Sequence, residues 1–226
     1  MTTIEPLYDK NCLCPLCTTS FTTKKLRSRF IKAKGFDSDF FPFYEEHNPL
    51  LYYVNVCPAC GFAFADQAEV RLNEAEKAIL TEKISSQWNP QNFGESRTIR
   101  DSVKTYKLAA YAGILRHEKH ILIAGLYIRL AWLYRMLEDV NEETRFMKLA
   151  LSEYELSYST GDFRGTQVSE IKTLYLAGEL CRRTSKTEQA VKYFSKVIEQ
   201  QSKTIEKNII SLAKDGWLKI RELQKA

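Results

Sequence analysis

Residues 57–61 read Cys57-Pro58-Ala59-Cys60-Gly61, and a matching turn, Cys14-Pro15-Leu16-Cys17, lies earlier in the chain. Each Cys-x-x-Cys turn places two thiols side by side, and two such turns supply the four thiolates that zinc takes in structural sites. With four sulfur ligands the ion has no open position for substrate or water. We therefore predict one structural Zn²⁺ ion held by Cys14, Cys17, Cys57 and Cys60.

Two alternatives remain for these cysteines: buried thiols or a redox pair. In a reducing compartment, paired Cys-x-x-Cys motifs are typical of metal binding. Cys12 lies two residues before Cys14 and is either a substitute ligand in a shifted register or a spectator. Cys181 lies far from the other five cysteines in the chain, and we expect it to be a small buried hydrophobic residue.

The segment around the two turns lacks helical periodicity. It is rich in aromatic residues, proline and glycine, which favours short strands and loops, and we expect strands at 25–32 and 51–56. The two cysteine pairs are farther apart than the roughly 15 to 20 residues of a compact zinc ribbon. We therefore predict a small β-rich, zinc-ribbon-like module over residues 1–65 that contains an inserted segment.

The rest of the chain has helical character. A connecting helix and linker are expected over residues 66–97, with the helix at 66–86, Asp66 as its N-cap and Glu69 as its capping-box partner. A helical domain is expected over residues 98–226. Its apolar stripes predict helices at 98–117, 120–138, 141–159, 167–184, 187–203 and 205–224.

The helices also carry a repeat. The tetratricopeptide signature places small residues where the two helices of a hairpin approach closely, and its spacing is longer here than the usual repeat of roughly 34 residues. The signature positions are Leu174, Ala177, Gly178, Cys181, Ala190 and Phe194, and Tyr127, Leu130, Ala131 and Tyr134 repeat its first half. The predicted fold is mainly α: the zinc-ribbon-like module, then tetratricopeptide-like hairpins closed by a C-terminal capping helix.

A run of basic residues follows the first cysteine pair. Lys25, Arg27 and Arg29 alternate along the expected strand, so they would share one face and bind phosphate or another anion, including nucleic acid. The alternative is a solvated strand face balanced by the acidic residues just beyond it. A net charge of +5 over the whole chain is too mild to decide between the two.

The next segment combines aromatic residues with short polar ones. Asp37, Asp39 and His47 carry side chains that ligate metals, so this loop is a candidate for a second, weaker metal site or a binding loop. The alternative is a miniature core in which Asp37 and Asp39 pair with Arg27 or Arg29.

Several function classes find no support in the sequence. No apolar leader opens the chain, and the longest apolar run, 121–128, is far shorter than the roughly 20 residues that cross a bilayer. No phosphate loop, nucleophile elbow or His-Glu-x-x-His motif is present. We expect a cytoplasmic protein that binds partners rather than an enzyme, with no membrane contact and no small-molecule substrate.

Seven segments together resemble a bacterial family known as domain of unknown function 2225. They are Cys14-Pro-Leu-Cys17, Arg27-Ser-Arg29-Phe30, Asp37-Ser-Asp39-Phe40, Asn48-Pro-Leu-Leu-Tyr52, Cys57-Pro-Ala-Cys60-Gly61, Ala131-Trp-Leu-Tyr-Arg135 and Tyr175-Leu-Ala-Gly-Glu-Leu-Cys-Arg-Arg183. The resemblance implies a zinc-ribbon-like head on a tetratricopeptide-like body, and it supplies no activity.

Three functional hypotheses follow. The leading one is an adaptor or scaffold whose helical repeats bind a protein or peptide partner. The second is a protein that binds nucleic acid or a phosphate anion through Lys25, Arg27 and Arg29. The third is a metal-dependent enzyme that uses Asp37, Asp39 and His47.

Overall fold

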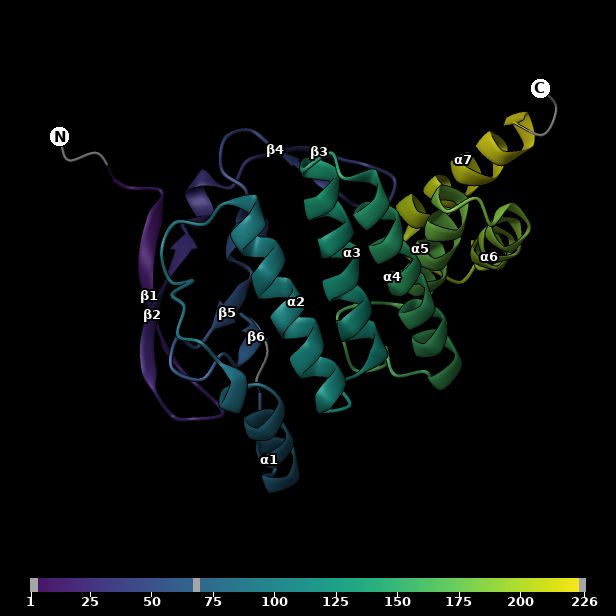
Figure 1. Ribbon diagram of the computed structural model, residues 1–226. Coiled ribbons are helices and arrows are strands. Elements are labelled where there is room, and N and C mark those ends of the chain that lie inside the picture. The colour runs from purple at the N-terminus through teal and green to yellow at the C-terminus, as the bar shows by residue number, and fades with distance from the viewer. Residues whose placement is uncertain (1–3, 67–69, 224–226) are drawn as a thin grey trace. The chain divides into compact units, whose positions relative to one another are not determined.

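The chain begins with short strands and continues as helices (Figure 1). The computed structural model describes residues 4–66 and 70–223. Within these ranges three antiparallel strand pairs precede seven α-helices. The prediction of a mainly α protein with a small β-rich N-terminal part and a C-terminal helix is confirmed.

The three strand pairs are separate two-stranded sheets. They are β1 (Leu7–Leu13) with β2 (Ser20–Leu26), β3 (Ala33–Phe36) with β4 (Pro42–Tyr44), and β5 (Val54–Val56) with β6 (Ala63–Ala65). In the first pair Leu7 lies opposite Leu26, and Leu13 lies opposite Ser20. All three pairs lie in the region predicted to be rich in short strands.

Both strands predicted by position need correction. The expected strand at 25–32 is wrong, because β2 ends at Leu26 and a 3₁₀ turn, Ser28–Phe30, follows. The amides of Phe30 and Ile31 bond back to Arg27 and Ser28, so they are not available to a strand partner. The expected strand at 51–56 begins only at Val54, because a 3₁₀ turn over Pro49–Tyr52 precedes it.

The helices after residue 98 match their predicted positions within a few residues. They are α2 (Ile99–Leu115), α3 (His120–Met136), α4 (Val140–Thr160), α5 (Glu170–Arg183), α6 (Thr187–Glu199) and α7 (Lys207–Leu223). Side-chain caps fix two of their starts: Thr98 accepts from the Asp101 amide, and Ser169 accepts from the Lys172 amide.

The connecting helix starts later than predicted. α1 spans Glu74–Lys83, and its capping box is formed by Asn73 and Glu76, whose side chains each accept from the other's backbone amide. The predicted capping box was Asp66 with Glu69, and Glu69 lies outside the described residues. Asp66 accepts hydrogen bonds from Lys10 and Asn55 instead.

The chain forms two compact units and crosses between them several times. The first comprises the chain up to Phe36, then Pro42–Glu118 and Trp132–Asp139; the second comprises Asp37–Phe41, Lys119–Ala131 and the chain from Val140 onward. Helix α2, which the sequence grouped with the later helices, lies in the first unit and packs on β5 and β6.

In the second unit, α5, α6 and α7 pack against one another. The signature residue Gly178 faces Phe194, and a Cβ added at Gly178 would lie 2.9 Å from the Phe194 ring. Phe194 and Ala190 are both fully buried. The close approach expected of a tetratricopeptide-like hairpin is therefore present between α5 and α6.

Candidate metal centre

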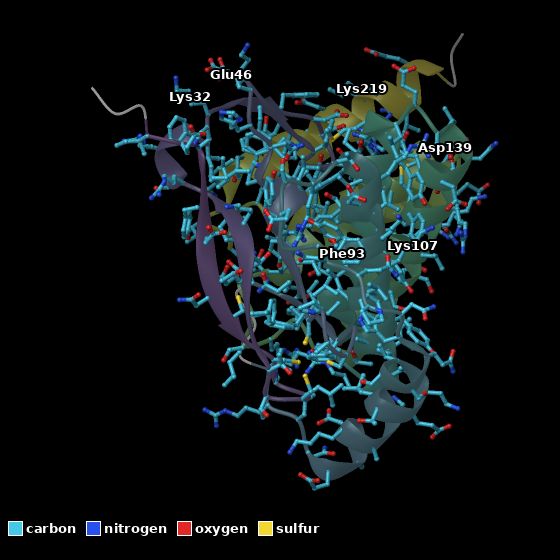
Figure 2. The ribbon with its side chains drawn as sticks, turned by 60° about the vertical axis from the view of Figure 1, so that its left-hand side comes forward. Lys32, Glu46, Phe93, Lys107, Asp139 and Lys219 are labelled. Carbon is cyan, nitrogen blue, oxygen red and sulfur yellow. The ribbon has the colours of Figure 1, made fainter. Side chains whose placement is uncertain are left out.

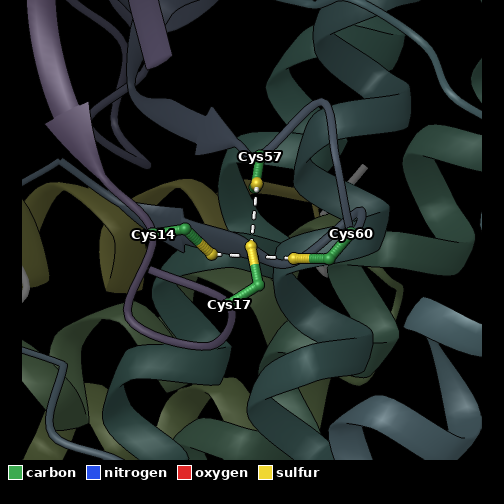
Figure 3. A group of neighbouring side chains, drawn as sticks. All are labelled: Cys14, Cys17, Cys57 and Cys60. Carbon is green, nitrogen blue, oxygen red and sulfur yellow. Dashed lines mark hydrogen bonds between the residues drawn. The ribbon is translucent and has the colours of Figure 1, made fainter. Parts of the chain in front are cut away.

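Four cysteine sulfurs converge on one point (Figure 3). The Sγ atoms of Cys14, Cys17, Cys57 and Cys60 all lie within 4.8 Å of one another, and none is in a disulfide. The Cys14–Cys60 and Cys17–Cys57 sulfur pairs are each 3.6 Å apart. A tetrahedral ion with sulfur bonds of about 2.3 Å separates its ligands by about 3.8 Å. The spacing of the four thiols therefore fits a tetrahedral metal ion.

The two cysteine turns have the same backbone construction. In the first, the Cys14 amide donates to Thr19 O at 3.0 Å, and the Thr18 amide donates to Cys14 O at 3.0 Å. In the second, the Cys57 amide donates to Phe62 O, and the Gly61 amide donates to Cys57 O, each at 2.9 Å. The residue after each second cysteine has positive φ, 59° at Thr18 and 73° at Gly61. The duplicated motif is thus also a duplicated conformation.

The thiols lie in an apolar setting. Cys14 and Cys57 have no exposed surface, and Cys60 is 6% exposed. Buried apolar residues, among them Phe62, Leu80 and Ile84, pack around them. A metal ion held here would be shielded from water on most sides, which suits a structural rather than a catalytic centre.

Their shared hydrogen bonds shift the thiol pKa values apart. The bond from Cys60 lowers the pKa of Cys14 to about 5. The same bond, together with burial, raises the pKa of Cys60, and burial raises the pKa of Cys57 to about 11. At neutral pH Cys57 is therefore protonated unless a metal ion displaces its proton, so metal binding releases protons.

Sequence reasoning missed Trp88, which lies against the second turn. Its indole Nε1 donates to Pro58 O at 2.8 Å. The only sequence signal was a large aromatic residue in a predicted linker, which does not reveal what it covers. Cys12 faces Phe21 across the β1–β2 pair and is not part of the metal-ligating group, while Cys181 is buried in α5, as expected.

The predicted basic residues do not share a face. Lys25 is only 6% exposed. Its Nζ lies 3.2 Å from Asp66 Oδ1 and also donates to Tyr52 O. Burial lowers the pKa of Lys25 to about 8. Arg27 and Arg29, by contrast, are exposed. Residues two apart share a face only within a strand, and β2 ends at Leu26, before Arg27 and Arg29. An anion-binding role for these residues stays a prediction.

Asp37 and Asp39 contact a different arginine from the one expected. The observed ion-pair partner is Arg183 at the end of α5, and not Arg27 or Arg29. The Arg183 Nη2 atom lies 2.8 Å from Asp37 Oδ1 and 3.8 Å from Asp39 Oδ1. Between them, Ser38 donates to the buried carboxylate of Glu179 on α5. Sequence could not reveal this, because some 140 residues separate the partners.

His47 contacts Glu46 at 3.8 Å, and its ring lies edge-on to Phe30. In the described part of the chain, the four cysteines are the only group of three or more side chains placed to hold a metal ion. The metal site predicted at Asp37, Asp39 and His47 stays a prediction.

None of the helices in the described ranges is long and apolar enough to cross a membrane.

Comparison with known proteins places this architecture in one family. Neither the curated proteins nor the solved structures include a match to the chain. A family model described as "Uncharacterized protein conserved in bacteria (DUF2225)" matches residues 7–220, nearly the whole length. With its paired cysteine turns and helical body, the chain belongs to the DUF2225 family.

Proposed function

We propose that this protein is a cytoplasmic adaptor whose first unit is held together by one structural zinc ion. The observation that carries the zinc assignment is the convergence of four sulfurs within 4.8 Å, three of them from buried cysteines. Thiolate sulfur is a ligand set that selects zinc over magnesium or calcium.

A partner surface for the adaptor is proposed beside the metal centre. A hollow of about 340 Å³ is lined by Trp88, Phe93, Leu108 and Tyr111, with Lys104 and Lys107 beside them. Phe93 and Lys107 of this set are labelled in Figure 2. Tyr111 is 44% exposed. Aromatic walls flanked by lysines suit a peptide that inserts an apolar side chain next to acidic residues.

The metal and this surface are physically connected. Trp88 lines the hollow and also donates to Pro58 O, inside the second cysteine turn. Loss of the metal would free that turn and with it one wall of the surface. The adaptor proposal therefore expects partner binding to require the metal.

The zinc assignment is tested by metal analysis of the protein purified without chelator, and by Co²⁺ substitution, whose absorption reports thiolate ligation. We expect one ion per chain in the wild type and its loss in Cys57→Ser and Cys60→Ser. Cys12→Ser and Cys181→Ser are matched controls that should retain the metal. A wild-type protein without stoichiometric metal would overturn the assignment.

The partner surface is tested by cross-linked capture from the native cell, followed by binding measurements with the purified candidate. Lys104→Glu and Tyr111→Ala should each abolish binding of a partner that the wild type retains. Lys148→Glu changes an exposed lysine of α4 and should have no effect. A partner that binds all variants equally does not use this surface, and the proposal would then be rejected.

A second candidate function is anion binding by Arg27 and Arg29. The two arginines, with Tyr8 and Ile31, line a surface hollow of about 510 Å³, and the Arg27 guanidinium lies 5.1 Å from the Tyr8 ring centre. Exposed cations beside an aromatic ring suit single-stranded nucleic acid. Binding of a labelled oligonucleotide should weaken steeply with salt and vanish in the Arg27→Glu, Arg29→Glu double variant. Absence of binding at low salt would exclude this function.

A further inference from the structure

The last helix of the second unit has an unusual outer face. Helices that end a stacked array normally present polar residues to solvent. On α7, Leu218 is 51% exposed and Trp217 beside it is only half-buried. Together with Ile198 of α6 they line a largely apolar surface hollow of about 470 Å³. The end of the array therefore exposes apolar surface at Trp217 and Leu218 among its polar residues.

The charges around Leu218 follow a mirrored pattern. Lys214 and Glu222 lie four residues before and after it, and Asp215 and Arg221 lie three residues before and after it. All five residues are exposed and share one face of the helix, because spacings of three, four, seven and eight residues return to the same side. Each of these four charges therefore has an opposite charge at the same distance on the other side of Leu218.

We propose that α7 pairs antiparallel with α7 of a second copy of this chain, about a two-fold axis that passes beside Leu218. In that arrangement residues equidistant from Leu218 lie opposite each other. Lys214 then faces Glu222 of the partner subunit, and Asp215 faces Arg221 of the partner subunit. Each pair occurs twice, as the self-complementary interface of a two-fold dimer requires.

The charge pattern favours a second copy over an acidic or basic peptide. A peptide of one sign would meet two like charges on this face, those of Asp215 and Glu222 or those of Lys214 and Arg221. The face is also partly ordered for pairing, because Arg221 already stacks on Trp217 with its guanidinium 4.5 Å from the ring centre. Lys214 donates only to Gln201, in an exposed contact that is readily exchanged.

The apolar hollow would add buried apolar surface to the charge pairs of this interface. Leu218 of one copy would cover the Trp217 and Ile198 surface of the other and exclude water from both. Charge alone on an exposed helix contributes little, whereas the burial of apolar surface supplies most of the affinity of such contacts. The charges then fix the antiparallel direction and the register.

Sedimentation velocity of the full chain over a concentration series tests this inference. We expect a monomer–dimer equilibrium that Leu218→Glu shifts entirely to monomer. Leu156→Glu is the matched control, because Leu156 is 42% exposed on α4 and lies outside the proposed interface. Circular dichroism of both variants establishes that they remain folded. A wild type that is monomeric throughout the series would overturn the proposal.

Charge reversal separates this interface from any other self-association. Lys214→Glu alone and Glu222→Lys alone place like charges opposite each other, so each variant should be monomeric. Mixing the two variants restores both opposite-charge pairs, and a heterodimer should form. The double variant that carries both changes should dimerise on its own. Failure of the mixture and of the double variant to associate would reject the antiparallel register, even if the wild type is a dimer.

Discussion

The indole of Trp88 lies directly over Gly61, the glycine that ends the second cysteine turn. A Cβ built on Gly61 would lie 2.4 Å from Trp88 Cε3, closer than real Cβ contacts allow, and the φ of Gly61 is 73°. Trp88 is fixed there by its hydrogen bond to Pro58 O in the same turn. The tryptophan and the glycine thus close the metal centre together.

Gly61→Ala should therefore weaken metal retention and stability at once. The left-handed backbone alone costs a non-glycine residue about 1–2 kcal/mol, and displacement of the indole adds to that cost. We expect a lower denaturation midpoint and faster transfer of the metal to a chromogenic chelator.

Two glycines serve as controls for this prediction. Gly165→Ala introduces a side chain at φ 74° with nothing within 4 Å, so it reports the backbone cost alone. Gly35→Ala adds a methyl group in open space without positive φ and should be nearly neutral. If Gly61→Ala costs no more than Gly165→Ala and keeps its metal, the indole does not close the centre.

A second prediction concerns Arg97, which is 6% exposed. Its guanidinium donates to the carbonyls of Phe93, Leu51 and Val54 and to the Thr23 hydroxyl. Arg97→Met leaves these acceptors without their donor, and we expect a loss of about 3 kcal/mol in the free energy of unfolding. Arg97→Lys, which keeps the charge but not the planar fork, should recover only part of it.

Urea unfolding of the full chain measures this loss. Arg100→Met changes an exposed arginine three residues further along the chain and should alter stability by less than about 0.5 kcal/mol. Equal effects of Arg97→Met and Arg100→Met would mean that water replaces the guanidinium at the three carbonyls.

Local patterns predicted the features that depend on a few neighbouring residues. The helix positions after residue 98 followed from apolar stripes, and the thiol cluster followed from the duplicated Cys-x-x-Cys turn. The capping box of Asn73 and Glu76 carries the same kind of signal, so the true start of α1 was readable from the sequence.

Features that depend on distant partners were not predictable in this way. Lys25 looks like a surface lysine until Asp66, some 40 residues later, is placed beside it. Asp37 and Asp39 look like free carboxylates or partners of nearby arginines until α5 brings Arg183 to them. Burial and pairing are decided there by tertiary packing, which a single sequence does not report.

A third prediction concerns this contact with α5. The Arg183 Nε atom lies 2.7 Å from Glu179 Oε1. The same guanidinium also pairs with Asp37 and Asp39. Asp39 has no exposed surface. Arg183→Met leaves a buried carboxylate without that partner, so we expect a loss of about 3 kcal/mol. Hydrogen exchange of the amides at 37–41 should also accelerate.

The reason for the loss is tested by a second change in the same background. Asp39→Asn removes the buried charge that Arg183 pairs with in the wild type, so the Arg183→Met, Asp39→Asn double variant should be more stable than Arg183→Met alone. Arg182→Met should cost less than Arg183→Met, because Glu179 keeps Arg183 and Ser38 as partners. A double variant less stable than Arg183→Met would show that packing, not charge, fixes the segment.

The fourth prediction is a pH dependence from Lys25. Burial lowers its pKa to about 8 from the ordinary value of 10.5, so between these values the unfolded lysine binds a proton that the folded one does not. The free energy of unfolding should therefore gain up to about 1.4 kcal/mol per pH unit as the pH rises through that interval. Lys25→Met removes this gain.

Urea unfolding of wild type and Lys25→Met between pH 8 and 10.5 gives the difference that checks this prediction. Lys24→Met is the control, because Lys24 pairs with Asp9 at the surface and this contact raises its pKa. The contribution of Lys24 to the free energy of unfolding is therefore constant below pH 10.5 and is lost only above that pH. The Lys24→Met curve should run parallel to that of the wild type, and the Lys25→Met curve should diverge from it. If all three run parallel, the ion pair with Asp66 outweighs burial and Lys25 stays charged inside the protein.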